Sequence, residues 1–96
     1  MKVVWQRKAV RDLDDIWDYS VAMWGDSRAR AYLTAIRATA EALASADRMG
    51  SAEDGVKSGL RRQFSGSHAV WYRMDGEPVQ VIRVLQQSQE AGRWVD

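Results

Sequence analysis

The sequence predicts an α+β domain in which a two-helix hairpin packs on a small, mostly antiparallel sheet, in the order β-α-α-β-β-β. Three observations predict this class. Apolar residues recur at spacings of three and four from Ala9 to Leu43, which is a helical period. Short apolar runs with strand character follow at residues 60–74 and 79–85. Another β-type run, Val3–Trp5, precedes the helices.

The chain has 96 residues, which is enough for one domain (1–96) with a single small core. It contains no cysteine, so a disulfide framework and a thiolate metal site are both excluded. Charged residues near the start of the chain interrupt the apolar run that a signal peptide requires. No apolar segment is long enough to span a membrane. We therefore expect a cytoplasmic protein with no cofactor, no metal and no membrane contact.

The net charge of +1 hides an uneven layout. Residues 10–26 carry five aspartates, whereas residues 55–74 carry no acid and four basic side chains: Lys57, Arg61, Arg62 and Arg73. The chain therefore has an acidic helical part and a basic strand part. A nucleic-acid-binding domain is more uniformly basic, so we expect no direct sequence-specific binding to nucleic acid.

The first helix is predicted to bury one face: Ala9, Leu13, Ile16, Trp17, Ser20 and Trp24. Its acidic side chains are Asp12, Asp14, Asp15 and Asp18. No His or Glu joins these aspartates at ligand spacing, so they are interpreted as a solvated face and not as a metal site.

Gly25 is expected to end the first helix, and Asp26 or Ser27 to cap the second. The second helix is predicted to bury Ala29, Tyr32, Leu33, Ile36, Ala40 and Leu43. The two helices then form a hairpin. Residues 47–59 form a polar, glycine-containing connection to the strands.

Strand alternation predicts which side chains share a face of the sheet. The charge-free set should face the helices: Val70, Tyr72, Met74, Ile82 and Val84. The opposite face should carry Trp71, Arg73, Val81 and Arg83. Tryptophan, arginine and aliphatic side chains together are typical of a protein-binding hot spot, although they could also stack on and clamp RNA.

Two further features complete the predicted site. Arg61 and Arg62 are adjacent in a strand, so they should point to opposite faces. Trp94 lies in a polar tail, residues 86–96, which is either disordered in the free chain or held where the indole docks. The predicted partner-binding residues are Arg61, Arg62, Trp71, Arg73, Val81, Arg83 and Trp94.

The residues also carry a family resemblance over nearly the whole chain. In the helices it rests on Ala9, Asp12-Leu13, Ile16, Tyr19, Trp24-Gly25, Ala31 and Tyr32. After the helices it rests on Leu43-Ala44, Met49-Gly50, Arg61-Arg62, Gly66-Ser67-His68 and Tyr72-Arg73. Together with the element order, these residues resemble the ParE branch of the ParE/RelE superfamily of bacterial toxins.

The resemblance implies the toxin of a type II toxin–antitoxin module, neutralised by a cognate ParD-like antitoxin. ParE-type toxins bind and inhibit DNA gyrase, whereas RelE-type relatives cut mRNA on the ribosome. Two positions depart from the family pattern: Asp47 replaces a common proline, and Gln86-Gln87-Ser88 replaces a His-Gln-Arg segment. Because the second region is linked to toxicity in parts of the family, an inactive relative that only binds its antitoxin is a further alternative.

The residues favour binding over catalysis. RNA cleavage needs a general base, a proton donor and cations for the phosphate. His68 is the only histidine, lies beside a turn and is better explained by a structural role. Residues 86–96 contain neither Tyr nor Lys. We therefore expect no catalytic residue, with the RelE-type endoribonuclease as the alternative. We expect Arg73 and Arg83 to pair with carboxylates of the antitoxin or with Asp75, Glu77 or Glu90 of this chain.

Overall fold

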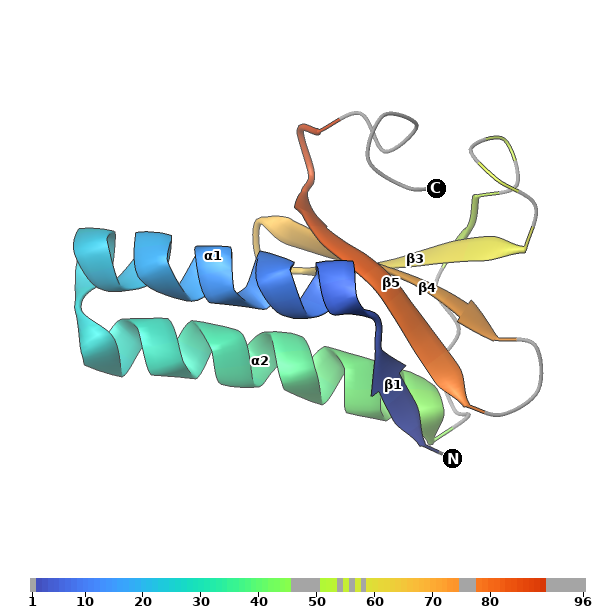
Figure 1. The fold of residues 1–96 in the computed structure, drawn as a ribbon, viewed down its shortest axis with the longest axis horizontal. Helices are drawn as coiled ribbons and strands as arrows, with labels where there is room; N and C mark the ends of the chain where they lie inside the picture. Colours follow the sequence, from blue (N-terminus) through green and yellow to red (C-terminus); the bar gives the residue numbers. More distant parts are fainter. Residues whose placement is uncertain are drawn as a thin grey trace.

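The structure is a computed structural model that describes residues 2–45, 51–53, 55, 57, 59–74 and 78–89. The elements follow in the order β1 (Val3–Trp5), α1 (Arg7–Trp24), α2 (Asp26–Ala44), β2 (Ser51–Ala52), β3 (Leu60–Ser65), β4 (His68–Met74) and β5 (Val79–Gln86) (Figure 1). The predicted α+β class is confirmed. The short strand β2 is an addition, because it lies in the stretch predicted to be an irregular connection.

The sheet has five strands in the order β1-β5-β4-β3-β2. Strands β3, β4 and β5 form an antiparallel meander, β2 pairs antiparallel with β3, and β1 pairs parallel with β5. Figure 1 shows α1 and α2 side by side and antiparallel, with their connection at the end remote from the sheet. Within the part of the chain that the structure describes, neither helix is apolar enough over a sufficient length to span a bilayer.

The buried helix faces agree with the predicted period. The core between helices and sheet contains Ala9, Leu13, Ile16, Leu33, Ile36, Ala40, Val70, Val81 and Val84. Trp17 packs partly buried against this core, but the prediction that Trp24 is a core residue is wrong, since 47% of its surface is exposed. Trp24 is the last residue of α1, beyond the part of the hairpin that the sheet covers.

Gly25 both ends α1 and precedes α2. Its φ of +87° lies in a region that residues with a side chain rarely adopt, and it lets the chain reverse in a single residue. The amide of Gly25 donates to the carbonyl of Val21 at 2.9 Å, and the amide of Ala29 donates to the carbonyl of Gly25 at 3.1 Å. The prediction of Asp26 or Ser27 as a side-chain cap is wrong, because α2 begins at Asp26 without a side-chain cap bond.

A β-bulge in β5 changes the predicted faces of the sheet. Trp71 pairs with Arg83, whereas Tyr72 pairs with Val81, so Ile82 is an extra residue between two regular stretches. One extra residue inverts the alternation on one side of the bulge. Val81 therefore faces the helices and is fully buried, and its predicted place on the exposed face is wrong. Ile82 packs on the opposite side, which is also the reverse of the prediction.

The face away from the helices has a small core of its own. It consists of Leu60, Ala69, Trp71 and Leu85, with Ile82 packed against it. Trp71 is only 4% exposed, so the prediction of an exposed indole on this face is wrong. The remainder of the predicted helix-facing set is confirmed, because Val70, Tyr72 and Val84 are buried against the helical side.

Candidate partner-binding site

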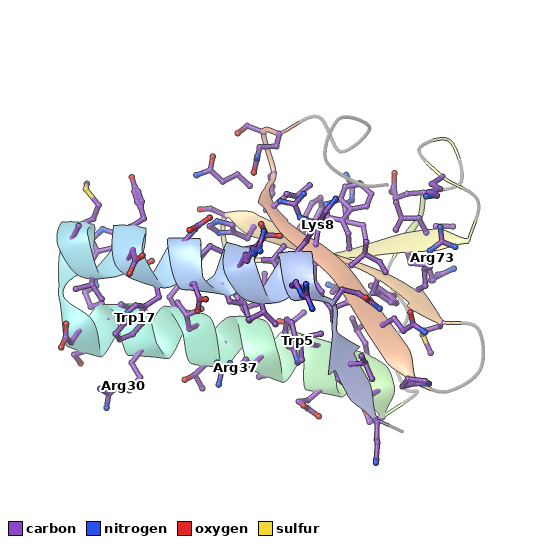
Figure 2. All side chains as sticks on the ribbon, in the orientation of Figure 1. Trp5, Lys8, Trp17, Arg30, Arg37 and Arg73 are labelled. Carbon is purple, nitrogen blue, oxygen red and sulfur yellow. The ribbon has the colours of Figure 1, made fainter. Side chains whose placement is uncertain are left out.

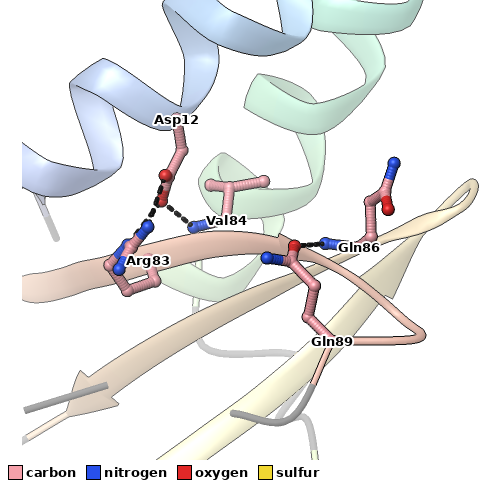
Figure 3. Close-up of polar contacts among 5 residues, drawn as sticks. All are labelled: Asp12, Arg83, Val84, Gln86 and Gln89. Atoms are coloured by element: carbon pink, nitrogen blue, oxygen red, sulfur yellow. Dashed lines mark hydrogen bonds and ion pairs between the residues drawn. The ribbon is translucent and has the colours of Figure 1, made fainter. Parts of the chain in front are cut away.

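A buried ion pair joins α1 to β5 (Figure 3). The Arg83 guanidinium donates from Nε to Oδ2 of Asp12 and from Nη2 to Oδ1, both at 2.7 Å. The Val84 amide donates to the same Oδ2 at 2.9 Å. The exposed fractions of the two charged side chains are 11% for Asp12 and 14% for Arg83. A bidentate, charge-assisted pair of this kind holds the helix and the strand in one geometry.

The position of Asp12 follows from the length of β1. That strand pairs with β5 only as far as Val81, so the amides of β5 beyond it need another partner. The Asp12 carboxylate supplies one for Val84. The interpretation of Asp12 as part of a solvated face is therefore wrong. Its spacing of three from Ala9 and four from Ile16 is the signal in the sequence that places it on the buried face.

A second network joins α2 to the turn between β3 and β4. The Ser67 amide donates to the Tyr32 hydroxyl at 3.0 Å, and that hydroxyl lies 2.6 Å from Nδ1 of His68. The Tyr32 hydroxyl accepts the bond from Ser67, so its own proton is still available to be donated to Nδ1 of His68. This arrangement suits a neutral imidazole with its proton on Nε2, and it agrees with the structural role expected for His68.

Burial lowers the pKa of His68 below 6.5, and the Asp12 carboxylate opposes this with a smaller effect that raises it. We expect the single histidine resonance in an NMR titration of the folded protein to have its midpoint below 6.5. Between the folded and unfolded pKa values the unfolded chain binds more protons. The contribution of His68 to stability is therefore full above pH 6.5 and is lost as the pH falls through the folded pKa.

Urea unfolding at pH 7.5 and pH 5.5 tests the same expectation. The loss of stability on acidification should be smaller in His68→Gln than in the parent chain, because glutamine does not titrate. Carboxylates that also titrate in this range contribute equally to the stability change of both proteins, so their contribution cancels in the comparison. A midpoint at or above 6.5 for His68, or an equal loss in both proteins, would contradict the assignment.

A groove of about 530 Å³ lies between α1, the turn after β3 and the end of β5. Its walls are Asp12, Asp15, Ile16, Tyr19, Ser20, Trp24, Tyr32, Ser67, His68, Arg83, Val84, Leu85, Gln86 and Gln89. Among these lining residues, the Gln86 amide donates to Oε1 of Gln89 at 2.8 Å (Figure 3). We call this feature the α1–β5 groove.

Four rings follow one another along the α1–β5 groove, of which Tyr19 and Trp24 stack and the other pairs meet at steeper angles. The ring centroids of Tyr19 and Trp24 are 6.2 Å apart, those of Trp24 and Tyr32 are 6.1 Å apart, and those of Tyr32 and His68 are 5.5 Å apart. The first two rings of this row are about half exposed to solvent: 50% of the surface of Tyr19 is accessible, and 47% of that of Trp24. The neighbouring Met23 is 60% exposed. Large apolar side chains gathered on the surface of a small domain are typical of an interaction site. The sequence does not reveal this cluster, because the helical period of α1 places Trp24 on the buried face.

The structure divides the predicted partner-binding residues. Arg61 and Arg62 lie on opposite faces as expected, since Arg61 pairs with Tyr72 and Arg62 pairs with Trp71 in the ladder. Arg62 forms an ion pair with Glu53 at 3.2 Å, and its guanidinium lies 4.6 Å from the Phe64 ring and 5.4 Å from the Trp71 ring.

Arg73 is partly exposed and pairs with Leu60, so it shares the face of Trp71 as predicted. Figure 2 shows Arg73 on the sheet side of the molecule, well apart from Arg30 and Arg37 on α2. Arg83 does not join that face, because its guanidinium is held by Asp12, which is not one of its predicted partners. Trp94 and the alternative ion-pair partners Asp75, Glu77 and Glu90 lie outside the described residues.

No metal centre is found in the described part of the chain, where no three acidic, His or Cys side chains gather closely enough to hold an ion. The Asp12 carboxylate is already engaged by Arg83 and Val84. The features that stand out among the described residues are an aromatic groove beside α1 and two arginines, Arg62 and Arg73, on the opposite side of the sheet.

The fold resembles one that has been solved in a toxin–antitoxin system. The structure of the chromosomal ParDE TA system from P. aeruginosa superposes with a TM-score of 0.77, over 90% of this chain and 95% of that chain, at 24% sequence identity. At that identity, the likeness establishes the fold.

Sequence similarity establishes the family. The family model of the ParE toxin of type II toxin–antitoxin system, parDE, matches residues 3–91. The chain is 46% identical over 85 residues to Toxin ParE1 of Caulobacter vibrioides, covering 88% of both proteins. It is 35% identical over 82 residues to Toxin ParE1 of Mycobacterium tuberculosis, covering 84% of both. The chain belongs to the ParE toxin family of type II toxin–antitoxin systems.

Proposed function

We propose that this chain is the toxin of a two-protein module, that it binds and inhibits DNA gyrase without bond chemistry of its own, and that a ParD-like antitoxin neutralises it. The observation that carries the proposal is the family match, which extends from residue 3 to residue 91 and so includes both helices and the meander. Gyrase and the antitoxin are cytoplasmic partners, which fits the compartment expected from the sequence.

The side-chain network supports binding over RNA cleavage. A general acid must carry a proton near neutral pH, and burial favours the neutral form of His68. The Nδ1 atom of His68 is occupied by Tyr32, and the Arg83 guanidinium is occupied by Asp12. These groups hold helices and strands together, so a reacting phosphate would have to displace structural contacts to use them.

The antitoxin has two kinds of surface to bind. The α1–β5 groove offers half-exposed aromatic rings to an amphipathic helix, and the two edges of the sheet, β1 and β2, offer main-chain groups to an added strand. Arg62 and Arg73 lie on the far side of the sheet, where acidic residues of the partner would complement them.

To test the proposal, the toxin is purified free of its antitoxin and two activities are measured. We expect the free toxin to inhibit the supercoiling of relaxed plasmid by gyrase, and added antitoxin to restore it. The same preparation should leave mRNA intact on translating ribosomes. Cleaved mRNA with unaffected gyrase would instead support the RelE-type endoribonuclease. Absence of both effects, with antitoxin binding retained, would identify an inactive relative.

A further inference from the structure

The described residues that line the α1–β5 groove carry a net negative charge. Asp12 and Arg83 line it together and neutralise each other. The third full charge on its walls is Asp15, which is exposed and forms no ion pair within the described part of the chain. A charged partner entering this groove should therefore be a cation.

The aromatic wall has the same preference. The indole of Trp24 and the ring of Tyr19 stack at an interplanar angle of 26°, and both are half-exposed. The face of such a ring attracts a guanidinium or an ammonium group, most strongly in tryptophan. Asp15 and Tyr19 are four residues apart on α1, so the carboxylate and the Tyr19 ring lie on one side of the helix.

We propose that the α1–β5 groove is the docking site for an arginine or lysine side chain of the antitoxin, held by the Asp15 carboxylate and the face of the Tyr19 ring, on which the Trp24 indole stacks. The inference rests on the proposed function and adds to it the chemistry of one contact. Apolar residues flanking that cation in the antitoxin would cover Tyr19 and Met23, which are half or more exposed. An acidic antitoxin segment would be repelled here and belongs instead on the side of Arg62 and Arg73.

The experiment measures the dissociation constant of the complex between this toxin and the antitoxin encoded beside it. Asp15→Asn should weaken the complex about tenfold, and Tyr19→Leu by a similar factor, since a desolvated charge pair and a cation–π contact each contribute on that scale. Asp18→Asn is the matched control, because Asp18 is an exposed aspartate of the same helix that does not line the groove. Circular dichroism and thermal melts confirm that each variant is folded.

A charge cycle identifies the partner residue. Each Lys and Arg of the antitoxin is changed to Gln in turn, and each change is combined with Asp15→Asn. Replacing one particular basic residue should weaken binding to the parent toxin, but should have little additional effect on binding to the Asp15→Asn toxin. Asp15→Asn equal to Asp18→Asn, or no antitoxin residue coupled to Asp15, would overturn the docking proposal while leaving the antitoxin partnership intact. Failure of the parent toxin to bind the antitoxin would overturn the proposed function and this inference with it.

Discussion

Replacing Asp12 by alanine is expected to lower the free energy of unfolding by about 3–5 kcal/mol, the range found when one partner of a buried ion pair is removed. Two kinds of bond are lost together. Arg83 loses two charge-assisted bonds of 2.7 Å, and the Val84 amide loses its acceptor on the edge of β5. A domain of this length has a stability on the order of 5–14 kcal/mol. The change therefore removes a large share of the total.

Urea unfolding followed by far-UV circular dichroism measures this loss. The matched controls are Asp14→Ala and Asp18→Ala, because both aspartates are exposed on the same helix. They should change the unfolding free energy by no more than about 0.5 kcal/mol. A loss for Asp12→Ala similar to that of the controls would mean that the pair contributes nothing net to the fold.

The pair can also be removed from both sides. In the double variant Asp12→Ala/Arg83→Met, the cost should be smaller than the sum of the two single changes, because neither charge is then left buried without the other. Purely additive costs would indicate that Asp12 and Arg83 act through separate contacts. The bond to the Val84 amide is lost in both the single variant Asp12→Ala and the double variant. The coupling between the two changes therefore reports on the ion pair and not on that bond.

The helical hairpin was predictable because its signal is periodic and repeated. Apolar residues return to one face over five turns of each helix, so an individual deviation does not shift the assignment. The deviation that did occur, at Trp24, arises from tertiary context. The sequence period continues to the end of α1, but Figure 1 shows the helix extending past the sheet that would bury it.

The strand faces were less predictable because alternation depends on an unbroken count. The extra residue Ile82 reverses every assignment before it in β5, and its aliphatic side chain gives no local sign of a bulge. Val81 was therefore assigned to the wrong face. Arg83 was assigned to an exposed surface for a related reason, since its partner Asp12 lies 71 positions away in the sequence. No local pattern reports a contact of that separation.

The sole histidine illustrates a site that is partly visible in the sequence. Its place beside a Gly-Ser turn indicated a structural role, but not the identity of its partner. Tyr32 comes from α2 and binds both His68 and the amide of Ser67, so one hydroxyl connects the hairpin turn to the helix. Gly66, between these contacts, then becomes a position of large expected effect.

Gly66→Ala is expected to destabilise the protein by about 2–4 kcal/mol, combining backbone strain with steric overlap. Gly66 has a φ of +58°, a conformation unfavourable for alanine. A Cβ atom there would lie 2.7 Å from Cε1 and 2.9 Å from the hydroxyl of Tyr32. The ring would have to move, and its bonds to Ser67 and His68 would weaken. Urea unfolding measures the loss.

Two controls separate overlap from other effects of adding a methyl group. Gly55→Ala should be nearly neutral, because a Cβ at Gly55 meets no atom within 4 Å and its φ is not in the positive range. In a Tyr32→Ala background the overlap is absent, so Gly66→Ala should then cost only the backbone strain, about 1 kcal/mol. An equal cost in both backgrounds would show that Tyr32 does not pack on the turn. Since Tyr32 also lines the α1–β5 groove, the same displacement should weaken antitoxin binding, which links the geometry of this turn to the proposed interface.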